Sequence, residues 1–313
     1  MPPTEASELR QLSLFDLGVD MAALRADRQR LSLASRAPNT RRALEGNWKG
    51  FAAWCAVAGR KPLPASGETV ELYLTALARR CKVSTLQQHA WAIAQQHKAA
   101  RVASPVAAGA REVIAAVARS TGVQSAPKAA LAPEELREIV NRLDPTTHRG
   151  ARDRALLVLG FATGLRRSEL AALQLCDVAF APKGLVVTVR RSKRDQVAAG
   201  REIGVFRGRR PETCPVRALR AWLRKRGDGA GSLFGVSGWS VNEIVRAGVE
   251  SIGLDVSEYG AHSLRAGMVT AANAAGVPDT AIMKRSGHKS VATLARYVRH
   301  RDLFAFDPLA RAL

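Results

Sequence analysis

Apolar residues that recur every three or four positions constrain the fold of this chain more than any other feature of its sequence. In residues 38–59, Leu44, Trp48, Phe51 and Cys55 keep this spacing, which marks one face of a helix. The same spacing predicts three more helices, over residues 66–80, 84–100 and 109–120. The first part of the chain is therefore predicted to be helical.

Polar residues mark where two of these helices begin. Ser66 or Thr69 is expected to cap the helix over residues 66–80, and Ser84 with Gln87 has the spacing of a capping box for the next one. The residues expected on the inner faces are Val70, Leu74, Leu77, Leu86, Ala90, Ile93 and His97.

Short β-branched segments interrupt the helical pattern in the second half of the chain. A helix is predicted near Pro133, and the apolar residues 155–165 predict a buried helix. Three strands are predicted at residues 176–180, 184–191 and 201–206, followed by further helices. The predicted fold class is mainly α with a small antiparallel β-sheet.

A change in composition suggests where the chain divides. Residues 123–130 are mostly small or polar and lack periodicity, which is typical of a linker. We expect a leader at residues 1–35, a helical domain at residues 36–122 and a second domain at residues 131–313.

The charge of the chain favours nucleic acid as its partner. Lysine and arginine total 48 against 27 acidic residues, a formal net charge of +21, and arginine is well suited to bidentate phosphate contacts. No apolar run approaches the roughly 18 residues of a membrane span. The acidic residues Glu5 and Glu8 do not fit a secretory signal, so we expect the protein to be cytoplasmic.

The sequence shows no pattern for a cofactor or a metal ion. The four cysteines are scattered, with no CxxC pair and no histidine at zinc-ligand spacing. The chain also lacks the GxxxxGK[ST] loop of nucleotide-binding proteins. We expect neither disulfides nor a bound metal, and no cofactor.

Four short motifs hold the candidate functional residues. Arg166 follows the buried helix in TGLRRSEL, with Glu169 three residues later, and Lys193 lies between the second and third predicted strands, flanked by Arg191 and Arg194. Each of these has a purely structural reading. Arg166 suits a helix-capping arginine paired with Glu169, and Lys193 suits a solvated charge or a phosphate contact.

The other two motifs lie near the end of the chain. AHSLRAG places His262 and Arg265 at i, i+3 spacing on one helix face, and SGHKSVATLARYVR contains His288 and Tyr297. Taken singly, the histidine of the first motif suits a core or cap position, and Tyr297 suits a half-buried residue of a surface helix.

Together these motifs make the chain resemble the tyrosine recombinase family, the phage and plasmid integrases, over about residues 35–300. The family has the same order: an arginine after a TGL turn, a lysine in a β-hairpin, an H-x-x-R pair, a G-H and a nucleophilic tyrosine. The helices around FAAWC and STLQQH resemble the family's helical core-binding (SAM-like) domain. One departure is SGH in place of the commoner leucine-glycine-histidine, and we expect Ser286 to alter packing more than chemistry.

The resemblance implies a clamp-like two-domain enzyme that cleaves and rejoins DNA through a 3′-phosphotyrosine, without metal or ATP. The implied catalytic residues are Arg166, Lys193, His262, Arg265, His288 and Tyr297, with Glu169 supporting them. In this scheme the arginines and His288 stabilise charge on the phosphate, His262 is the base, and Lys193 is the acid for the departing 5′-oxygen.

The resemblance also implies double-stranded DNA with inverted-repeat target sites as the partner, and a homo-oligomer on DNA, a tetramer in the synapse. The residues expected to contact DNA are Arg41, Arg42, Gln88, Arg191 and Arg194. Two other functions remain open at this point. They are a type IB topoisomerase-like nicking and closing enzyme, and a DNA-binding regulator without catalysis.

Overall fold

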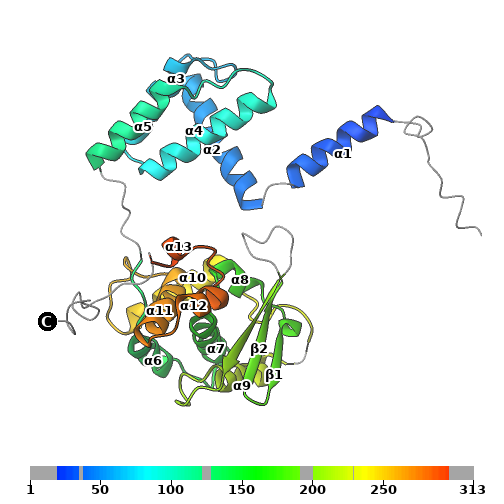
Figure 1. Cartoon of the computed structure of the whole chain (residues 1–313), viewed down its shortest axis with the longest axis vertical. Helices are drawn as coiled ribbons and strands as arrows, with labels where there is room; N and C mark the ends of the chain where they lie inside the picture. The colour runs from blue at the N-terminus through cyan, green and yellow to red at the C-terminus, as the bar shows by residue number, and fades with distance from the viewer. Residues whose placement is uncertain (1–19, 35–37, 122–127, 191–199, 228, 296–313) are drawn as a thin grey trace, which may run out of the picture. The chain divides into compact units, whose positions relative to one another are not determined.

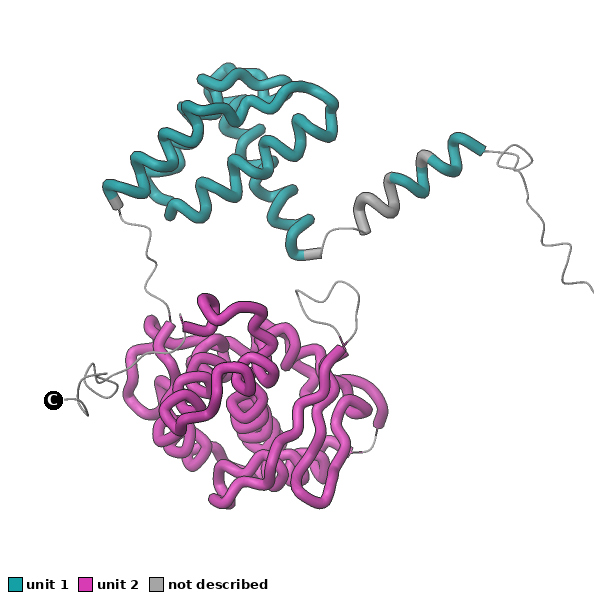
Figure 2. The backbone as a smooth tube through the Cα atoms, viewed as in Figure 1, with its two compact units in different colours: residues 1–125 teal, residues 126–313 magenta. Residues whose placement is uncertain are grey.

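The structure, a computed structural model, describes residues 20–34, 38–121, 128–190, 200–227 and 229–295. It divides the chain into two compact units, residues 1–125 and 126–313 (Figure 2). The division falls inside the segment 123–130 that the sequence marks as a linker.

The described part of the first unit is helical, and the helices that follow the first one pack around an apolar core (Figure 1). The helices are α1 (Met21–Ala34), α2 (Pro38–Val57), α3 (Gly67–Ala78), α4 (Val83–Ala99) and α5 (Ala108–Thr121). Helix α2 packs against α4, and α3 packs against α4 and α5. Phe51, Leu74, Leu86 and Ile93 are fully buried between them, so the predicted apolar faces are confirmed.

One of the two expected helix caps is present and the other is not. Ser66 caps α3, because its Oγ accepts a hydrogen bond from the Thr69 amide at 3.2 Å. The capping box of Ser84 and Gln87 is wrong, since α4 begins one residue earlier, at Val83. Val83 is only 5% exposed, so burial of this apolar side chain overrides the capping preference of the serine that follows it.

The second unit combines helices with one small sheet. Its helices are α6 (Pro133–Arg142), α7 (His148–Thr163), α8 (Arg167–Ala172), α9 (Pro215–Arg226), α10 (Gly238–Ser251), α11 (Ala261–Ala274), α12 (Asp279–Ser286) and α13 (Val291–Ala295), with a 3-10 turn η2 (Leu175–Asp177). Helix α7 is the predicted buried helix and packs against α9 and α11. Among the residues described, no helix is long and apolar enough to cross a membrane.

The sheet consists of β1 (Val178–Ala181), β2 (Gly184–Val189) and β3 (Arg201–Phe206), antiparallel in that order. Val189 pairs with Arg201 at one end of the β2–β3 ladder, and Gly184 pairs with Phe206 at the other. The inner face of this sheet carries the buried residues Leu185, Val187, Ile203 and Val205. The β3 strand packs against α7 and α9, which confirms the predicted mainly helical fold with a small antiparallel sheet.

Candidate active site

The TGL motif forms the turn between α7 and α8 and places Arg166 at the start of the second helix. Gly164 ends α7 with φ = 63°, a left-handed conformation that glycine adopts without strain. A Cβ atom there would lie 2.1 Å from Cε of Met268, so a larger residue would also displace the end of this flexible side chain. Leu165 is buried, and Arg166 becomes the N-cap residue of α8.

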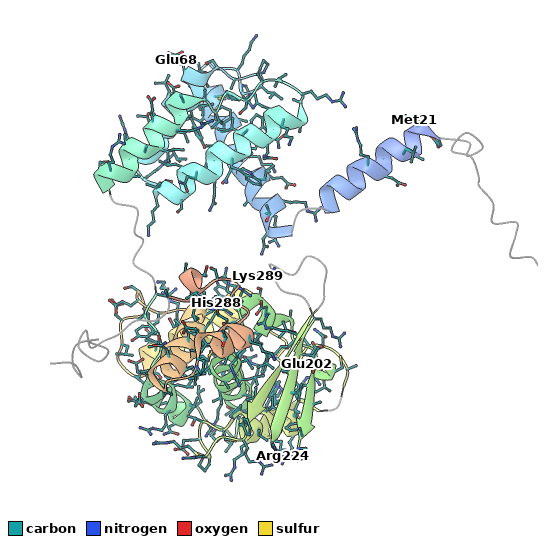
Figure 3. The ribbon with its side chains drawn as sticks, in the orientation of Figure 1. Met21, Glu68, Glu202, Arg224, His288 and Lys289 are labelled. Carbon is teal, nitrogen blue, oxygen red and sulfur yellow. The ribbon has the colours of Figure 1, made fainter. Side chains whose placement is uncertain are left out.

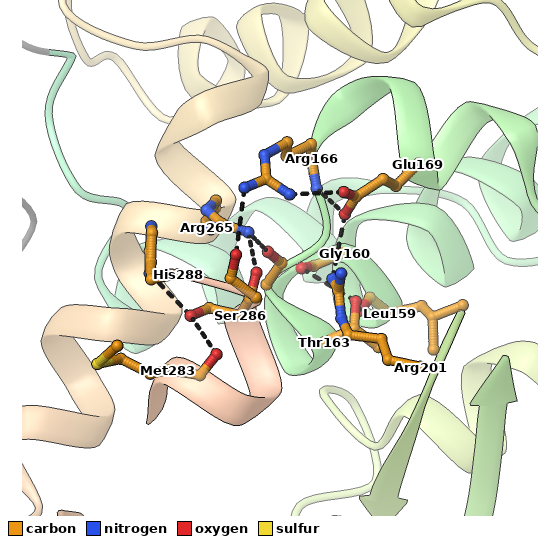
Figure 4. A network of polar contacts seen from close by, with 12 residues as sticks. Leu159, Gly160, Thr163, Arg166, Glu169, Arg201, Arg265, Met283, Ser286 and His288 are labelled. Atoms are coloured by element: carbon orange, nitrogen blue, oxygen red, sulfur yellow. Dashed lines mark hydrogen bonds and ion pairs between the residues drawn. The ribbon is translucent and has the colours of Figure 1, made fainter. Parts of the chain in front are cut away.

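Arg166 and Glu169 form a tight pair at this helix start (Figure 4). The Arg166 Nη1 donates to Glu169 Oε1 at 2.6 Å, and the Arg166 amide donates to Glu169 Oε2 at 3.1 Å. The Glu169 side chain is 2% exposed, whereas that of Arg166 is 20% exposed. The expected structural pairing is therefore present, and part of the guanidinium remains accessible.

Arg265 lies on α11 and connects two distant turns. Its Nη1 donates to the carbonyl oxygens of Gly164 at 2.8 Å and Ser286 at 2.6 Å. The side chain is 1% exposed, which is unusual for arginine. His262, one turn earlier on the same helix, is exposed. The buried guanidinium thus joins the TGL turn to the end of α12.

His288 follows Gly287, the C-cap residue of α12, whose φ is 71°. The Ser286 hydroxyl donates to the Ile282 carbonyl oxygen at 2.7 Å and lies 2.8 Å from His288 Nδ1. Because the hydroxyl proton is used toward Ile282, His288 Nδ1 is the donor to Ser286 Oγ. Ser286 therefore contacts the His288 ring directly and favours one orientation and one tautomer of it, while its effect on the chemistry relative to packing stays a prediction.

The turn formed by residues 286–288 is where these groups meet. Arg265 donates to Ser286 O, and Arg166 Nη2 donates to Gly287 O at 3.4 Å. His288 is 7% exposed beside them. Figure 3 shows where His288 and Lys289 follow α12 in the second unit. The structure therefore brings together Arg166, Glu169, Arg265 and His288 from three separate segments.

Two arginines that the sequence analysis did not select also lie here. Arg201 Nη2, on β3, donates to Glu169 Oε2 at 3.2 Å. Arg285 donates from Nη1 to Ala162 O at 2.7 Å and from Nη2 to Gly204 O at 2.9 Å, and burial lowers its pKa from the usual value of arginine. The available signal was the alternation in REIGVF, which puts Arg201 on the same face as two apolar residues.

Some of the expected site residues lie outside the residues that the structure describes. They are Lys193, Arg191, Arg194 and Tyr297. In the first unit, Arg42 and Gln88 are exposed, and Arg41 is partly buried. Within the described ranges, no group of three or more histidine, cysteine, aspartate or glutamate residues is arranged to hold a metal ion.

The other two tyrosines of the chain, which has three, are both buried. Tyr73 is 4% exposed in the first unit, where burial raises its pKa to about 12. Tyr259 is 6% exposed in the core of the second unit, and its hydroxyl donates to Glu135 Oε1 at 3.5 Å. Neither hydroxyl is accessible to a large substrate.

Comparison with known proteins gives consistent matches. The model of the phage integrase family matches residues 129–303. The integrase/recombinase xerD homolog of Selenomonas ruminantium is 33% identical over 293 residues, which cover 88% of this chain and 86% of that protein. The recombinase cre of Escherichia phage P1 is 25% identical over 288 residues, 81% of this chain and 82% of that protein.

A solved structure shows the same fold at low sequence identity. The Tn1549 transposon integrase in complex with transposon right end DNA superimposes with a TM-score of 0.64 and 14% identity. The match covers 88% of this chain and 94% of the integrase.

Proposed function

Since this chain belongs to the phage integrase family and is a site-specific tyrosine recombinase that breaks and rejoins DNA strands, we propose that Tyr297 is its nucleophile. The family match and the 33% identity confirm the resemblance drawn from the motifs. They do not favour the topoisomerase-like or regulatory functions.

The observation that carries the proposal is the convergence of cationic groups on the turn at residues 286–288. Arg166 and Arg265 both bond to carbonyl oxygens of this turn, and His288 ends it. Tyr297 lies nine residues further along the chain. Burial of the other two tyrosines supports the choice, because a hydroxyl enclosed in a core cannot reach a phosphate of the DNA backbone. For Tyr73, burial also raises the pKa to about 12, which disfavours the phenolate that attacks phosphorus.

The cationic groups stabilise charge that develops on the phosphate. Attack of the tyrosine oxygen on phosphorus builds negative charge on the non-bridging oxygens, and fixed donors at such a position are each worth about 10²- to 10³-fold in rate. We assign this task to Arg166 and Arg265, with His288 as a further donor from Nε2. With Nδ1–H already given to Ser286, the Nε2 donor requires the protonated imidazolium, which the transition-state charge favours.

Proton transfers complete the reaction. His262 takes the phenolic proton of Tyr297, and the new bond joins the tyrosine oxygen to phosphorus. The bond from phosphorus to the 5′-oxygen breaks, and Lys193 gives that oxygen a proton. The product is a 3′-phosphotyrosine and a free 5′-hydroxyl, and attack by the 5′-hydroxyl of a second strand reverses the step.

The recombinase acts on double-stranded DNA. We further propose the form of its target site, its assembly on DNA, its location in the cell and the residues that contact DNA. The target carries inverted repeats, four protomers assemble on two sites, and the reaction takes place in the cytoplasm. Residues 36–122 bind one side of the duplex and residues 131–313 the other, with 123–130 as the linker of a clamp. Arg41, Arg42 and Gln88 contact the DNA from the first domain, and Arg191 and Arg194 from the second.

The role of Lys193 is tested by a change in the leaving group. The substrate is a nicked duplex chosen from a random-sequence library by binding to the protein, made with either a normal 5′-oxygen or a bridging 5′-phosphorothiolate. We expect Lys193→Ala to cleave the oxygen substrate about 10²-fold more slowly and to recover on the sulfur substrate, because thiolate leaves without a proton. Equal loss on both substrates contradicts the assignment, and Lys183→Ala is the control.

A further inference from the structure

Arg201 occupies a position where the sheet pattern calls for an apolar side chain. It is the first residue of β3, and alternation places it on the same face as Ile203 and Val205, which are 3% and 4% exposed. Its own side chain is 19% exposed. An arginine that faces the core needs a compensating partner, because burying an unpaired charge costs several kcal/mol.

The partner is the buried carboxylate of Glu169, 32 residues earlier in the sequence. Arg201 Nη2 lies 3.2 Å from Glu169 Oε2, while Arg166 Nη1 occupies Oε1 at 2.6 Å (Figure 4). Both oxygens of the carboxylate are thus engaged by arginines. Two guanidinium groups around one carboxylate leave a net charge of about +1 at the site.

Arg201 also lies against the turn that precedes His288. A Cβ atom on Gly287 would fall 2.7 Å from Arg201 Nη1 and 3.0 Å from its Cζ, so the guanidinium is packed on the backbone of this glycine. Gly287 O in turn accepts a hydrogen bond from Arg166 Nη2 at 3.4 Å. One side chain therefore touches the glutamate that holds Arg166 and the turn that carries His288.

We propose that Arg201 is a positioning residue of the recombination reaction that acts through Glu169. This inference rests on the proposed function of Arg166. With Glu169 shared between two arginines, the carboxylate no longer cancels the charge of Arg166, and that charge remains available to the phosphate. Arg201 also pairs with Val189 at the end of the β2–β3 ladder. Strand β3, which follows Lys193 in the sequence, is therefore connected to the Glu169 carboxylate through the Arg201 side chain.

The experiment uses the full chain and a nicked duplex selected from a random-sequence library by binding to the wild-type protein. The variants are Arg201→Gln, Arg201→Lys, Glu169→Gln and the double variant Glu169→Gln/Arg201→Gln. For each, the single-turnover rate of covalent complex formation and the dissociation constant for DNA are measured. Arg207→Gln, an exposed position just beyond the other end of β3, is the matched control.

We expect Arg201→Gln to slow cleavage at least about tenfold while DNA affinity stays within about twofold, and Arg201→Lys to recover part of the rate. The double variant should be no slower than the slower of its two parents, because Arg201 has nothing to act through once Glu169 is neutral. Arg207→Gln should match the wild type.

Three results overturn the inference. The first is a double variant whose rate is reduced by the product of the factors found in the two single variants. The second is an Arg201→Gln variant whose affinity for DNA falls by the same factor as its cleavage rate. The third is an Arg201→Gln variant that cleaves at the wild-type rate. If Arg201→Gln does not fold, the comparison of Glu169→Gln with the double variant decides, since both lack the buried carboxylate that Arg201→Gln leaves with a single arginine. Equal rates in these two variants support the inference, and a slower double variant overturns it. A wild-type protein that forms no adduct contradicts the proposed function itself, whereas an adduct with multiplying losses contradicts only the role of Arg201.

Discussion

At the scale of single residues, Ser286 contacts the ring of His288, one of the proposed catalytic residues. Its hydroxyl donates to Ile282 O and accepts from His288 Nδ1, so the imidazole is held in one orientation. A leucine at this position would provide no such bond.

Replacing Ser286 by alanine tests this role. One hydrogen bond contributes about 1 kcal/mol, so we expect Ser286→Ala to slow covalent complex formation roughly fivefold and to shift its pH profile. The control is Ser251→Ala on α10, which also removes a serine-to-carbonyl hydrogen bond, to Gly248 O at 2.7 Å. Equal rates and pH profiles in the two variants would show that the hydroxyl does not tune His288.

Residues close in sequence were easier to predict than those joined by the fold. The pair of Arg166 and Glu169 is local, three residues apart across a helix start, and the sequence predicts it directly. The pair of Arg201 and Glu169 depends on the register of β2 and β3 and on the packing of β3 against α7, which no local pattern contains. A core-facing arginine in an alternating strand was the one sequence signal for it.

At the scale of secondary structure elements, His89 joins three helices of the first unit. Its Nδ1 lies 2.8 Å from the Tyr73 hydroxyl, which links α4 to α3, and its other bond is to the backbone of Asn47 on α2. Burial lowers the pKa of His89, and the bond to Asn47 opposes this shift. The neutral ring is therefore the form that suits the folded helices.

The pKa of His89 makes the stability of these helices depend on pH. The pKa of His89 in the folded protein lies below that of a histidine in the unfolded chain, which is about 6.5. The contribution of neutral His89 to the stability of the fold is therefore fully present above about pH 6.5. It is lost as the pH falls from there toward the folded pKa. We expect amide hydrogen exchange in α3 and α4 of the full chain, corrected for the intrinsic rate, to show falling protection from about pH 7.5 to about pH 5.5.

The variant His89→Gln should flatten this pH dependence, because glutamine does not titrate. Amides of α7, in the second unit, serve as the internal control within the same sample. An unchanged pH dependence of α3 and α4 in the variant would show that another group is responsible.

Helix periodicity predicted elements better than it predicted their ends. The apolar faces of α2, α3, α4 and α7 are where the sequence places them, because burial of a repeated face decides helix formation. The start of α4 was missed by one residue, since a serine that suits a cap is outweighed by a buried valine beside it. Short elements such as α13 lack enough residues to show a period.

At the scale of the whole molecule, a net charge of +21 governs how the protein meets DNA. Each phosphate contact releases condensed counterions, so the logarithm of the binding constant should fall steeply and linearly with the logarithm of salt concentration. Replacing Arg41 and Arg42 together by alanine should reduce the slope by about two if both contact phosphates. Fluorescence anisotropy with the selected duplex over a range of salt concentrations measures this.

Lys61→Ala is the matched control for the two arginines. It is exposed and lies beyond the other end of α2, about 30 Å from the first turn of that helix. A nearly salt-independent binding constant contradicts binding through phosphate contacts. An unchanged slope in the double variant removes Arg41 and Arg42 from the phosphate contacts.

Tyr297 is the central claim, and mapping of a covalent adduct tests it most directly. The protein is incubated with the selected nicked duplex, denatured and digested, and the peptide that carries the nucleotide is identified by mass spectrometry. We predict a 3′-phosphotyrosine on Tyr297, no adduct with Tyr297→Phe despite unchanged DNA affinity, and adducts retained in Tyr73→Phe and Tyr259→Phe. An adduct on any other residue, or one that persists in Tyr297→Phe, would contradict the account.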